Sequence, residues 1–471
     1  MALTVTNKNI PLIHRKEPQF MTPVPVNTAA GSFIITDIKE DDNVVMYVQS
    51  ATTQYLYHND EDAWIQIISG SLGGVFGAGT CGHKSRWGNT LIANGGSTTT
   101  ANTATAVNGL GRGSVIRFLT GSNAGLERTV THMLITPGGT NTFYFDALPN
   151  AVANNDTFIV STGRFYIFNA GTLSGTSFRN YDPLTGVWTS LSVTGLPASW
   201  GTDGKMVVTP SYDSFASGTA SSATTNTLTN SAKTWTANQW ANYQIRITAG
   251  TGIGQVRTIA SNTGTQITVS TNWTVTPDAT SQYVIEGNDD FLYLLGNNAV
   301  TMYRYSISGN SWTTLSPGVA RSSAPGTGMS ANWVASISST GWDDESNIRN
   351  GRYIYSFRGA ATGTLHRYDI ALNTWLEIAY INIAETFTTG SSYTKMDRYI
   401  YIRKENTGRM FKFSISGNYL EPLTTTLYPE STAVLGDKMW GVKYVENSEV
   451  KLTWLYWLGN TTNILHRMLI Y

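Results

Sequence analysis

Tryptophan residues recur in this chain at equal intervals. Trp64, Trp188 and Trp312 are equally spaced, and each closes a short phrase that begins with tyrosine. The phrases cover residues 57–64, 181–188, 305–312 and 368–375, while 413–420 is a degraded copy and a final hairpin over 465–470 extends the series to six. Because a fixed spacing means that one structural unit is used repeatedly, it constrains the architecture before any single strand is assigned.

Each repeat predicts four β-strands separated by turn residues. In the fourth repeat the strands are expected over residues 332–338, 352–357, 364–370 and 375–378. The third strand of several repeats alternates aromatic or histidine residues with basic ones, as in 365–368. This period of two sends the two sets of side chains to opposite faces of a sheet. The repeat is therefore a small antiparallel sheet.

The composition supports an all-β protein and narrows its partners. Only 13% of the residues are charged and 45 are glycine, which is typical of short strands joined by turns. Lysine plus arginine equals aspartate plus glutamate at 31 each, so no net charge favours nucleic acid or a membrane surface. The single cysteine, Cys81, excludes an intramolecular disulfide, and the N-terminus lacks the basic and apolar segments of a secretion signal.

The repeats resemble the kelch family of β-propellers, whose units end in a tyrosine-aspartate pair followed by a tryptophan on the outer strand. Residues 181–188 and 368–375 carry this pattern, while the family's double glycine is reduced to single glycines at Gly171, Gly296 and Gly359. The resemblance implies a six-bladed kelch-like β-propeller. It is expected to comprise residues 31–94, 162–213 and 287–471.

The ends of the chain predict how the ring closes. The last repeat stops at Tyr471, where its outer strand should begin. A common solution in the resembled folds is for an N-terminal segment to provide the missing strand. We therefore expect residues 1–30 to form an N-terminal arm, with part of 2–28 closing the propeller.

Two inserted segments, residues 95–161 and 214–286, are copies of each other. Residues 115–130 align with 244–259, and 156–160 align with 281–285. Alternating strands and glycine turns predict a small β-sandwich or barrel for each copy. Because both copies leave equivalent loops of neighbouring blades, they are expected to project from one face of the propeller, which we interpret as the partner surface.

The second inserted copy resembles a module found in virion proteins of tailed bacteriophages. The resemblance rests on Trp235, Trp240, the glycine run 250–254, the pair 262–263 and the segment 277–283. The first copy keeps the glycines and Arg128 but lacks both tryptophans. This resemblance implies a structural role in a virus particle.

No catalytic, cofactor-binding or metal-binding residue is assigned from the sequence, and no cofactor is expected. The glycine run 250–254 lacks the following helix that a phosphate loop needs. His366 and His466 occupy equivalent repeat positions, which indicates packing, and the acidic clusters lack calcium-loop spacing. The histidines also form no copper-ligand pattern of the kind that kelch-type oxidases use. We therefore do not expect an enzyme.

The leading hypothesis is a structural component of a tailed-bacteriophage virion, in the collar, tail or fibre apparatus or as a head decoration. Such a protein would be assembled in the host cytoplasm and would contact other virion proteins in a symmetric homo-oligomeric arrangement, without nucleic acid or membrane as partners. The alternative is a carbohydrate-binding or host-receptor-binding adhesin that stacks sugars on Trp200, Trp333 and Trp342, although the same tryptophans would also suit packing between blades. A kelch-type oxidase or glycosidase is the third hypothesis.

Overall fold

The computed structural model is built from β-strands, and the helical element among its described residues is a short 3-10 turn, η2 (Gly109–Gly111). The structure describes residues 19–27, 33–35, 44–50, 52–59, 61–67, 80–201, 205–208, 214–288, 290–296, 299–322, 331–334, 353–357, 363–370, 372–378, 385–387, 392–396, 399–404, 409–415, 417–423, 439–446, 449–458 and 463–470.

Six four-stranded antiparallel sheets form the blades of the main domain. From inner to outer strand, blade 1 contains β2 (Phe33–Ile35), β3 (Val44–Val48), β4 (Gln54–His58) and β5 (Ala63–Gln66); blade 2 contains β6 (Cys81–Ser85), β13 (Arg164–Phe168), β15 (Phe178–Asp182) and β16 (Val187–Ser190); blade 3 contains β18 (Lys205–Val208), β26 (Phe291–Leu295), β27 (Met302–Ser306) and β28 (Ser311–Thr314). Blade 4 contains β29 (Ala331–Val334), β30 (Tyr353–Phe357), β31 (Leu365–Asp369) and β32 (Thr374–Ile378); blade 5 contains β33 (Ser392–Met396), β34 (Tyr399–Arg403), β35 (Met410–Ser414) and β36 (Tyr419–Pro422); blade 6 contains β37 (Met439–Glu446), β38 (Glu449–Leu458), β39 (Leu465–Ile470) and β1 (Gln19–Met21).

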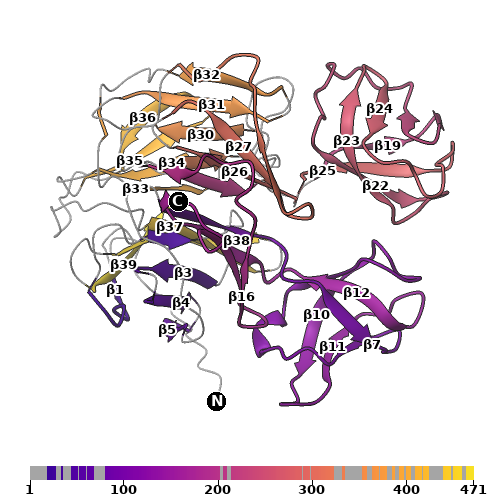
Figure 1. Ribbon diagram of the computed structural model, residues 1–471, viewed down its shortest axis with the longest axis horizontal. Helices are drawn as coiled ribbons and strands as arrows, with labels where there is room; N and C mark the ends of the chain where they lie inside the picture. Colours follow the sequence, from indigo (N-terminus) through magenta and orange to yellow (C-terminus); the bar gives the residue numbers. More distant parts are fainter. Residues whose placement is uncertain are drawn as a thin grey trace.

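The blades are arranged as a six-bladed β-propeller (Figure 1). The inner strands contact one another in the order β2, β6, β18, β29, β33 and β37. A hydrophobic cluster fills each interface between neighbouring blades, including the interface between blades 6 and 1. The prediction of an all-β propeller with six blades is therefore confirmed.

The repeated tyrosine and tryptophan are directly opposed across the outer hairpin of a blade. Their ring centroids are 4.6 Å apart for Tyr57 and Trp64, and 5.0 Å apart for Tyr305 and Trp312. Such offset aromatic pairs contribute about 0.5–1.5 kcal/mol beyond the area that they bury. The equal spacing of the tryptophans thus reflects a packing role that recurs in each copy.

In these blades a residue in the turn of the same hairpin forms hydrogen bonds to the segment that follows the preceding blade. We call this contact the latch. Asn310, at a positive φ of 45°, accepts hydrogen bonds from the hydroxyl of Tyr305 at 2.7 Å and from the amide of Ser192 at 2.8 Å. The indole of Trp312 donates to the carbonyl of Ser192 at 2.9 Å. In blade 4, Asn373 accepts from the hydroxyl of Tyr368 at 2.7 Å and donates its side-chain amide to the carbonyl of Ser316, after blade 3, at 2.9 Å. Asparagine suits this turn because it tolerates the left-handed conformation.

The N-terminal strand β1 forms the outer strand of blade 6, where it pairs antiparallel with β39. Asp62 takes the latch position in blade 1 and accepts from the amide of Thr22 at 3.0 Å, from its hydroxyl at 2.9 Å and from the hydroxyl of Tyr57 at 2.8 Å. The indole of Trp64 donates to the carbonyl of Thr22 at 3.0 Å. Blade 1 is therefore latched onto the segment that completes blade 6.

The basic residues of the third strands lie over aromatic rings of the second strands. Arg304 is 4.2 Å from the ring centroid of Phe291, and three similar pairs join Arg367 to Tyr353, Lys412 to Tyr399 and Arg467 to Trp454. A cation held over an aromatic face stabilises the fold by about 0.5–1 kcal/mol at an exposed site. The alternation of aromatic and basic residues in the third strand therefore also places these basic side chains over aromatic rings of the second strand.

Two β-modules are inserted between the inner and second strands of blades 2 and 3. Module 1, defined here as residues 91–160, has the strand order β7 (Leu91–Asn94), β12 (Asn154–Val160), β9 (Val115–Phe118), β10 (Glu127–Leu134), β11 (Asn141–Phe145) and β8 (Thr100–Thr103). Module 2, residues 214–286, has the order β19 (Ser214–Thr219), β25 (Gln282–Glu286), β22 (Gln244–Ala249), β23 (Val256–Asn262), β24 (Gln266–Val269), β21 (Thr227–Thr229) and β20 (Ser222–Ala223). Because β7 belongs to the sheet of module 1, the boundary expected at residue 95 is too late.

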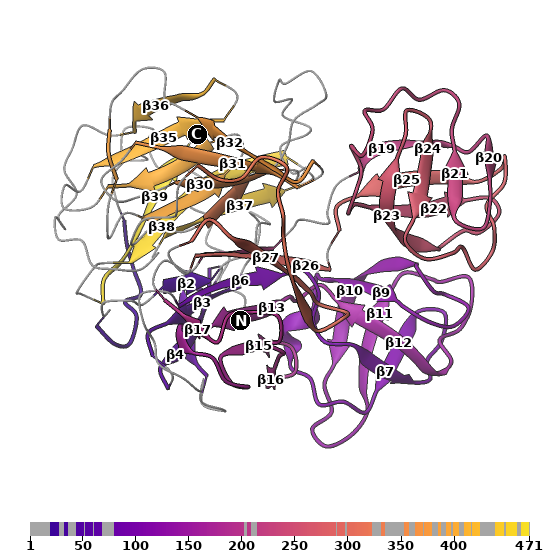
Figure 2. The same ribbon diagram turned by 45° about the horizontal axis from the view of Figure 1, so that its top comes forward.

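Each module bends around its own hydrophobic core. A bulge interrupts β10 between Val130 and His132, and another interrupts β23 between Ile259 and Ser261 at the aligned position. Bulges bend a strand and increase its twist, so the same strand contributes to both halves of the sheet. Separate clusters of buried side chains fill the two modules. The prediction of two homologous inserted β-modules is confirmed, and both lie on the same side of the propeller in Figures 1 and 2.

Candidate interaction surface of the paired modules

Module 1 is docked on the outer hairpin of its own blade. Leu184, in the turn between β15 and β16, is 1% exposed and belongs to the hydrophobic cluster of the module. Asn108 donates its side-chain amide to the carbonyl of Pro183 at 2.6 Å and its backbone amide to the carbonyl of Leu184 at 2.9 Å. A blade residue thus completes the core of the module, so the two parts pack as one body.

A stacked cluster supports the same junction. Two guanidinium groups lie over the ring of Trp87, with Arg86 at 4.4 Å and Arg117 at 4.5 Å from its centroid. Arg117 donates to Glu127 at 2.7 Å, and Arg86 lies 3.7 Å from the same carboxylate. Trp87 is 5% exposed, so the cluster is an internal support of the junction.

Module 2 is anchored to blade 3 through polar contacts. Arg304 of β27 donates to the side-chain oxygen of Asn242 at 2.7 Å, and the Gln244 amide lies 3.3 Å from Asn288. Within the module, Arg246 forms an ion pair with Glu286, which raises the pKa of the guanidinium by direct hydrogen bonding. The base of module 2 is therefore held by its blade, as that of module 1 is.

The two modules also contact each other through aligned glycine turns. A Cβ atom built on Gly125 would lie 2.1 Å from the carbonyl oxygen of Gly254, and one built on Gly254 would lie 2.6 Å from that of Ala124. The sequence alignment of the modules pairs Gly125 with Gly254. The same turn in each copy therefore meets its counterpart, and Figure 2 shows the strands of the two modules next to each other.

Electrostatics couple the modules across this contact. Burial by itself would raise the pKa of Glu127, but Arg117 and Arg86 outweigh it and hold the pKa of that carboxyl below its ordinary value. Arg246 of module 2 acts on Glu127 in the same direction. The carboxylate of module 1 is thus stabilised by charges from the blade, from its own module and from the neighbouring module.

The arginine shared by both copies braces its own module. Arg128 donates to the carbonyl of Ala147 at 2.9 Å, and Arg257 donates to the carbonyl of Asn272 at 2.9 Å. Nearby, the side-chain amide of Asn123 binds both the amide and the carbonyl of Asn150 in module 1. In module 2, Gln255 clamps the amide and the carbonyl of Val275 in the same way. These residues therefore hold loops within their own modules.

Of the three tryptophans proposed for sugar stacking, Trp200 is buried between two blades. Trp200 is 2% exposed and packs edge-on against Phe168 at 5.1 Å and Tyr303 at 5.7 Å, within the cluster between blades 2 and 3. Its assignment as a sugar contact is corrected, because its side chain is almost completely buried and leaves no ring face for a sugar to stack on. Trp333 lies in β29 of blade 4, and Trp342 lies outside the described residues.

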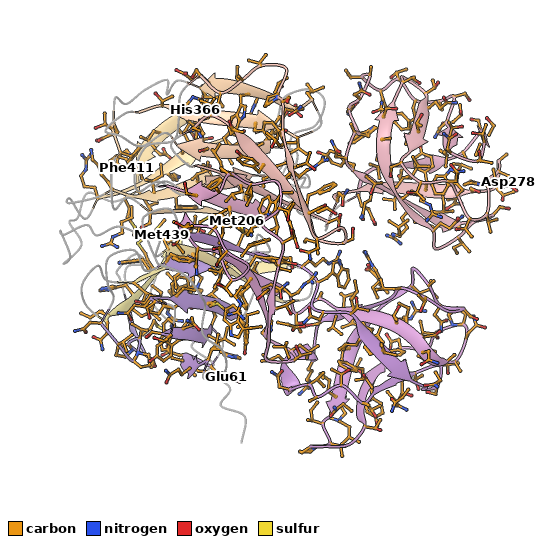
Figure 3. The ribbon with its side chains drawn as sticks, in the orientation of Figure 1. Glu61, Met206, Asp278, His366, Phe411 and Met439 are labelled. Atoms are coloured by element: carbon orange, nitrogen blue, oxygen red, sulfur yellow. The ribbon has the colours of Figure 1, made fainter. Side chains whose placement is uncertain are left out.

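The residues on which the resemblance of module 2 to virion proteins rests have structural roles within the module. Trp240 is 7% exposed, and its amide donates to Asn262 at 2.8 Å. Gly250, at a positive φ of 75°, is required because a Cβ atom there would lie 2.2 Å from the carbonyl oxygen of Thr280. Asp278 fixes the facing turn by accepting from the Thr280 amide at 2.8 Å and from the Thr251 hydroxyl at 2.7 Å. Figure 3 shows Asp278 at the end of module 2 that points away from the propeller.

A serine, a histidine and a carboxylate meet in blade 4, away from the modules in Figure 3. Ser322 lies 3.0 Å from Nε2 of His366 and also donates to Glu377. In a hydrolytic triad the acid binds the imidazole nitrogen opposite the serine. Here Glu377 lies on the serine side at 3.6 Å from Nε2, and Arg321 faces Nδ1 at 3.3 Å. The arrangement does not match a triad.

Two further searches concern ions and membranes. Within the described part of the chain, no group of three or more histidine, cysteine or acidic side chains is placed to hold a metal ion. Among the same residues, no helix has the length and apolar character needed to cross a membrane.

Comparisons with known proteins return structural neighbours and no family. No protein-family model and no curated protein matches the chain. A triple arginine-to-alanine mutant of AofleA from Arthrobotrys oligospora has a TM-score of 0.42 at 10% identity, with 97% of this chain and 87% of that chain covered. YjhT has a TM-score of 0.37 at 8% identity, with 96% of each chain covered. At such low similarity neither protein's ligand or activity transfers to this one, because one fold hosts many functions.

Proposed function

We propose that this protein is a non-catalytic structural component of a tailed-bacteriophage virion. In this proposal the propeller is the scaffold, and the paired modules bind other virion proteins. The resemblance of module 2 to modules of virion proteins gives the setting, and the overall balance of charge suits recognition by shape. A symmetric arrangement of several copies in the particle follows from the same proposal.

The observation that carries this proposal is the fixed placement of the two modules. Each module is held by its own blade, through Leu184 and Asn108 for module 1 and through Arg304 and Asn242 for module 2. The turns at Gly125 and Gly254 then hold the modules against each other. A surface that is already ordered loses little conformational entropy on binding, which favours a component of a permanent assembly.

Quantitative mass spectrometry of purified particles tests the proposal. The expected result is a fixed number of copies per particle, with the protein retained after the particles are washed at high salt. Its absence from purified particles, or a copy number that varies between preparations, would overturn the virion role. Image reconstruction of the same particles should then place the modules at a contact with another virion protein.

A further inference from the structure

One face of module 1 carries a pair of rings that reach solvent. His132 on β10 and Tyr144 on β11 are directly opposed in the antiparallel pair, and their ring centroids lie 5.5 Å apart with an interplanar angle of 44°. His132 is exposed and Tyr144 is half-buried. The strands that carry them are labelled in Figure 1. The rings lie on the outer face of the sheet, because Val130 and Phe143 fill the core on the other face.

Neutral side chains border the two rings along one side. Leu134, two residues after His132, is 50% exposed and lies opposite Thr142. The hydroxyl of Thr142 donates to the side-chain oxygen of Asn102 at 3.0 Å. Thr100 lies opposite Tyr144 on the neighbouring strand β8. The face formed by Thr100, Asn102, His132, Leu134, Thr142 and Tyr144, called the ring face below, contains no carboxylate, ammonium or guanidinium group.

Several polar groups of the ring face are available to a ligand. The hydroxyl of Tyr144, the ring nitrogens of His132 and the amide nitrogen of Asn102 make no hydrogen bond to any residue that the structure describes. The side-chain oxygen of Asn102 already accepts a hydrogen bond from the Thr142 hydroxyl. This bond fixes the orientation of the side-chain amide, and its nitrogen remains available to donate to a ligand. A donor is thus held in place beside the two rings.

Module 2 shows that the module fold does not require this pair. At the aligned positions next to its bulge, Ser261 lies opposite Thr268, and Thr227 lies opposite Thr268 on the neighbouring strand. The backbone pairing is the same in the two copies, whereas the outward side chains change from rings to small hydroxyl groups. The rings of module 1 therefore belong to its surface and are not needed for folding.

We propose that the ring face of module 1 binds a neutral saccharide. A sugar ring has an apolar face of C–H groups and a rim of hydroxyls, which matches one exposed and one half-buried ring bordered by hydroxyl and amide groups. The electron-rich faces of Tyr144 and His132 attract C–H groups, and Asn102 and the Tyr144 hydroxyl are placed to bond the rim. Because the ring face holds no arginine or lysine, it does not favour a sulfated or phosphorylated ligand. This site does not depend on the proposed role in the virion.

Calorimetric titration of the full-length protein tests the site. The probes are the neutral hexasaccharides cellohexaose, maltohexaose, hexa-N-acetylchitohexaose and mannohexaose, with a heparin hexasaccharide as the anionic comparison. The variant Tyr144→Thr carries the residue that module 2 has at this position, so its strand pairing is kept. The matched control is Thr268→Ala in module 2.

The expected result is that at least one neutral hexasaccharide binds and that Tyr144→Thr weakens this binding at least tenfold. His132→Ser should weaken the same binding, and Thr268→Ala should leave it unchanged. Equal melting temperatures for wild type and Tyr144→Thr show that the loss comes from the surface. Binding of the heparin hexasaccharide alone, binding that survives Tyr144→Thr, or no binding by any neutral probe would overturn the proposal.

Discussion

Replacing Gly125 with alanine probes the contact between the two modules. The glycine has a positive φ of 87°, so alanine there costs about 1–2 kcal/mol in backbone strain alone. The added methyl would also lie 2.1 Å from the carbonyl oxygen of Gly254 and 2.8 Å from its Cα. Both atoms belong to the backbone, so no side-chain rotation relieves the overlap. Overpacking of this kind adds about 1–3 kcal/mol, or else it forces the modules apart.

Gly113 provides the matched control in the same module. It has a positive φ of 81°, but a Cβ atom there would meet nothing within 4 Å. Gly113→Ala should therefore show the backbone strain alone. Scanning calorimetry measures the loss of stability, and small-angle X-ray scattering measures the separation of the modules through the radius of gyration. We expect Gly125→Ala to lose more stability than Gly113→Ala and to scatter as a larger particle. If the two variants lost the same stability and neither changed the radius of gyration, the contact between Gly125 and Gly254 would be refuted.

Four further variants test the latch, the docked module and the charge cluster. Asp62→Ala removes the acceptor for Thr22 and should cost about 1–2 kcal/mol in thermal unfolding, whereas Asp62→Asn, which copies the latch residue of blades 3 and 4, should cost less; equal losses would contradict the latch. Leu184→Ala leaves a cavity in module 1 and should destabilise it by about 2–5 kcal/mol, seen as faster hydrogen exchange in residues 91–160; unchanged exchange there would oppose the docking. The folded-state pKa of Glu127 lies below the ordinary 4.5, so its stabilisation is complete above that value and is lost as the pH falls through the folded value. The melting-temperature difference between wild type and Glu127→Gln should therefore be largest near pH 7 and shrink towards pH 3, and a difference independent of pH would argue against the cluster.

Much of the propeller could be predicted because its repeat is local. The tyrosine and tryptophan of one phrase are opposed in a single hairpin, so their spacing along the chain is also their geometry. Likewise, the alternation of residue types within each third strand shows which side chains lie on which face of the sheet. The same reasoning failed for Trp200, since its burial depends on Phe168 and Tyr303, which approach it from elsewhere in the chain.

The ring face of module 1 could not be predicted from the sequence. His132 falls beyond the segment 115–130 that was aligned with module 2, and Tyr144 lies on the following strand. Their opposition becomes apparent only with the bulge after Val130, which shifts the register between β10 and β11. Sequence spacing alone does not locate a bulge, and a shift of one residue moves every side chain to the other face.

The sequence by itself determined the number of blades, the strands of the repeat and the presence of two copied modules, because each depends on patterns within a few tens of residues. Only the tertiary structure decided that Leu184 completes the core of module 1 and that Gly125 meets Gly254. These contacts join segments far apart in the chain, and their energies depend on distances of a few tenths of an ångström. Such distances are set by how the blades pack together, which no local pattern records.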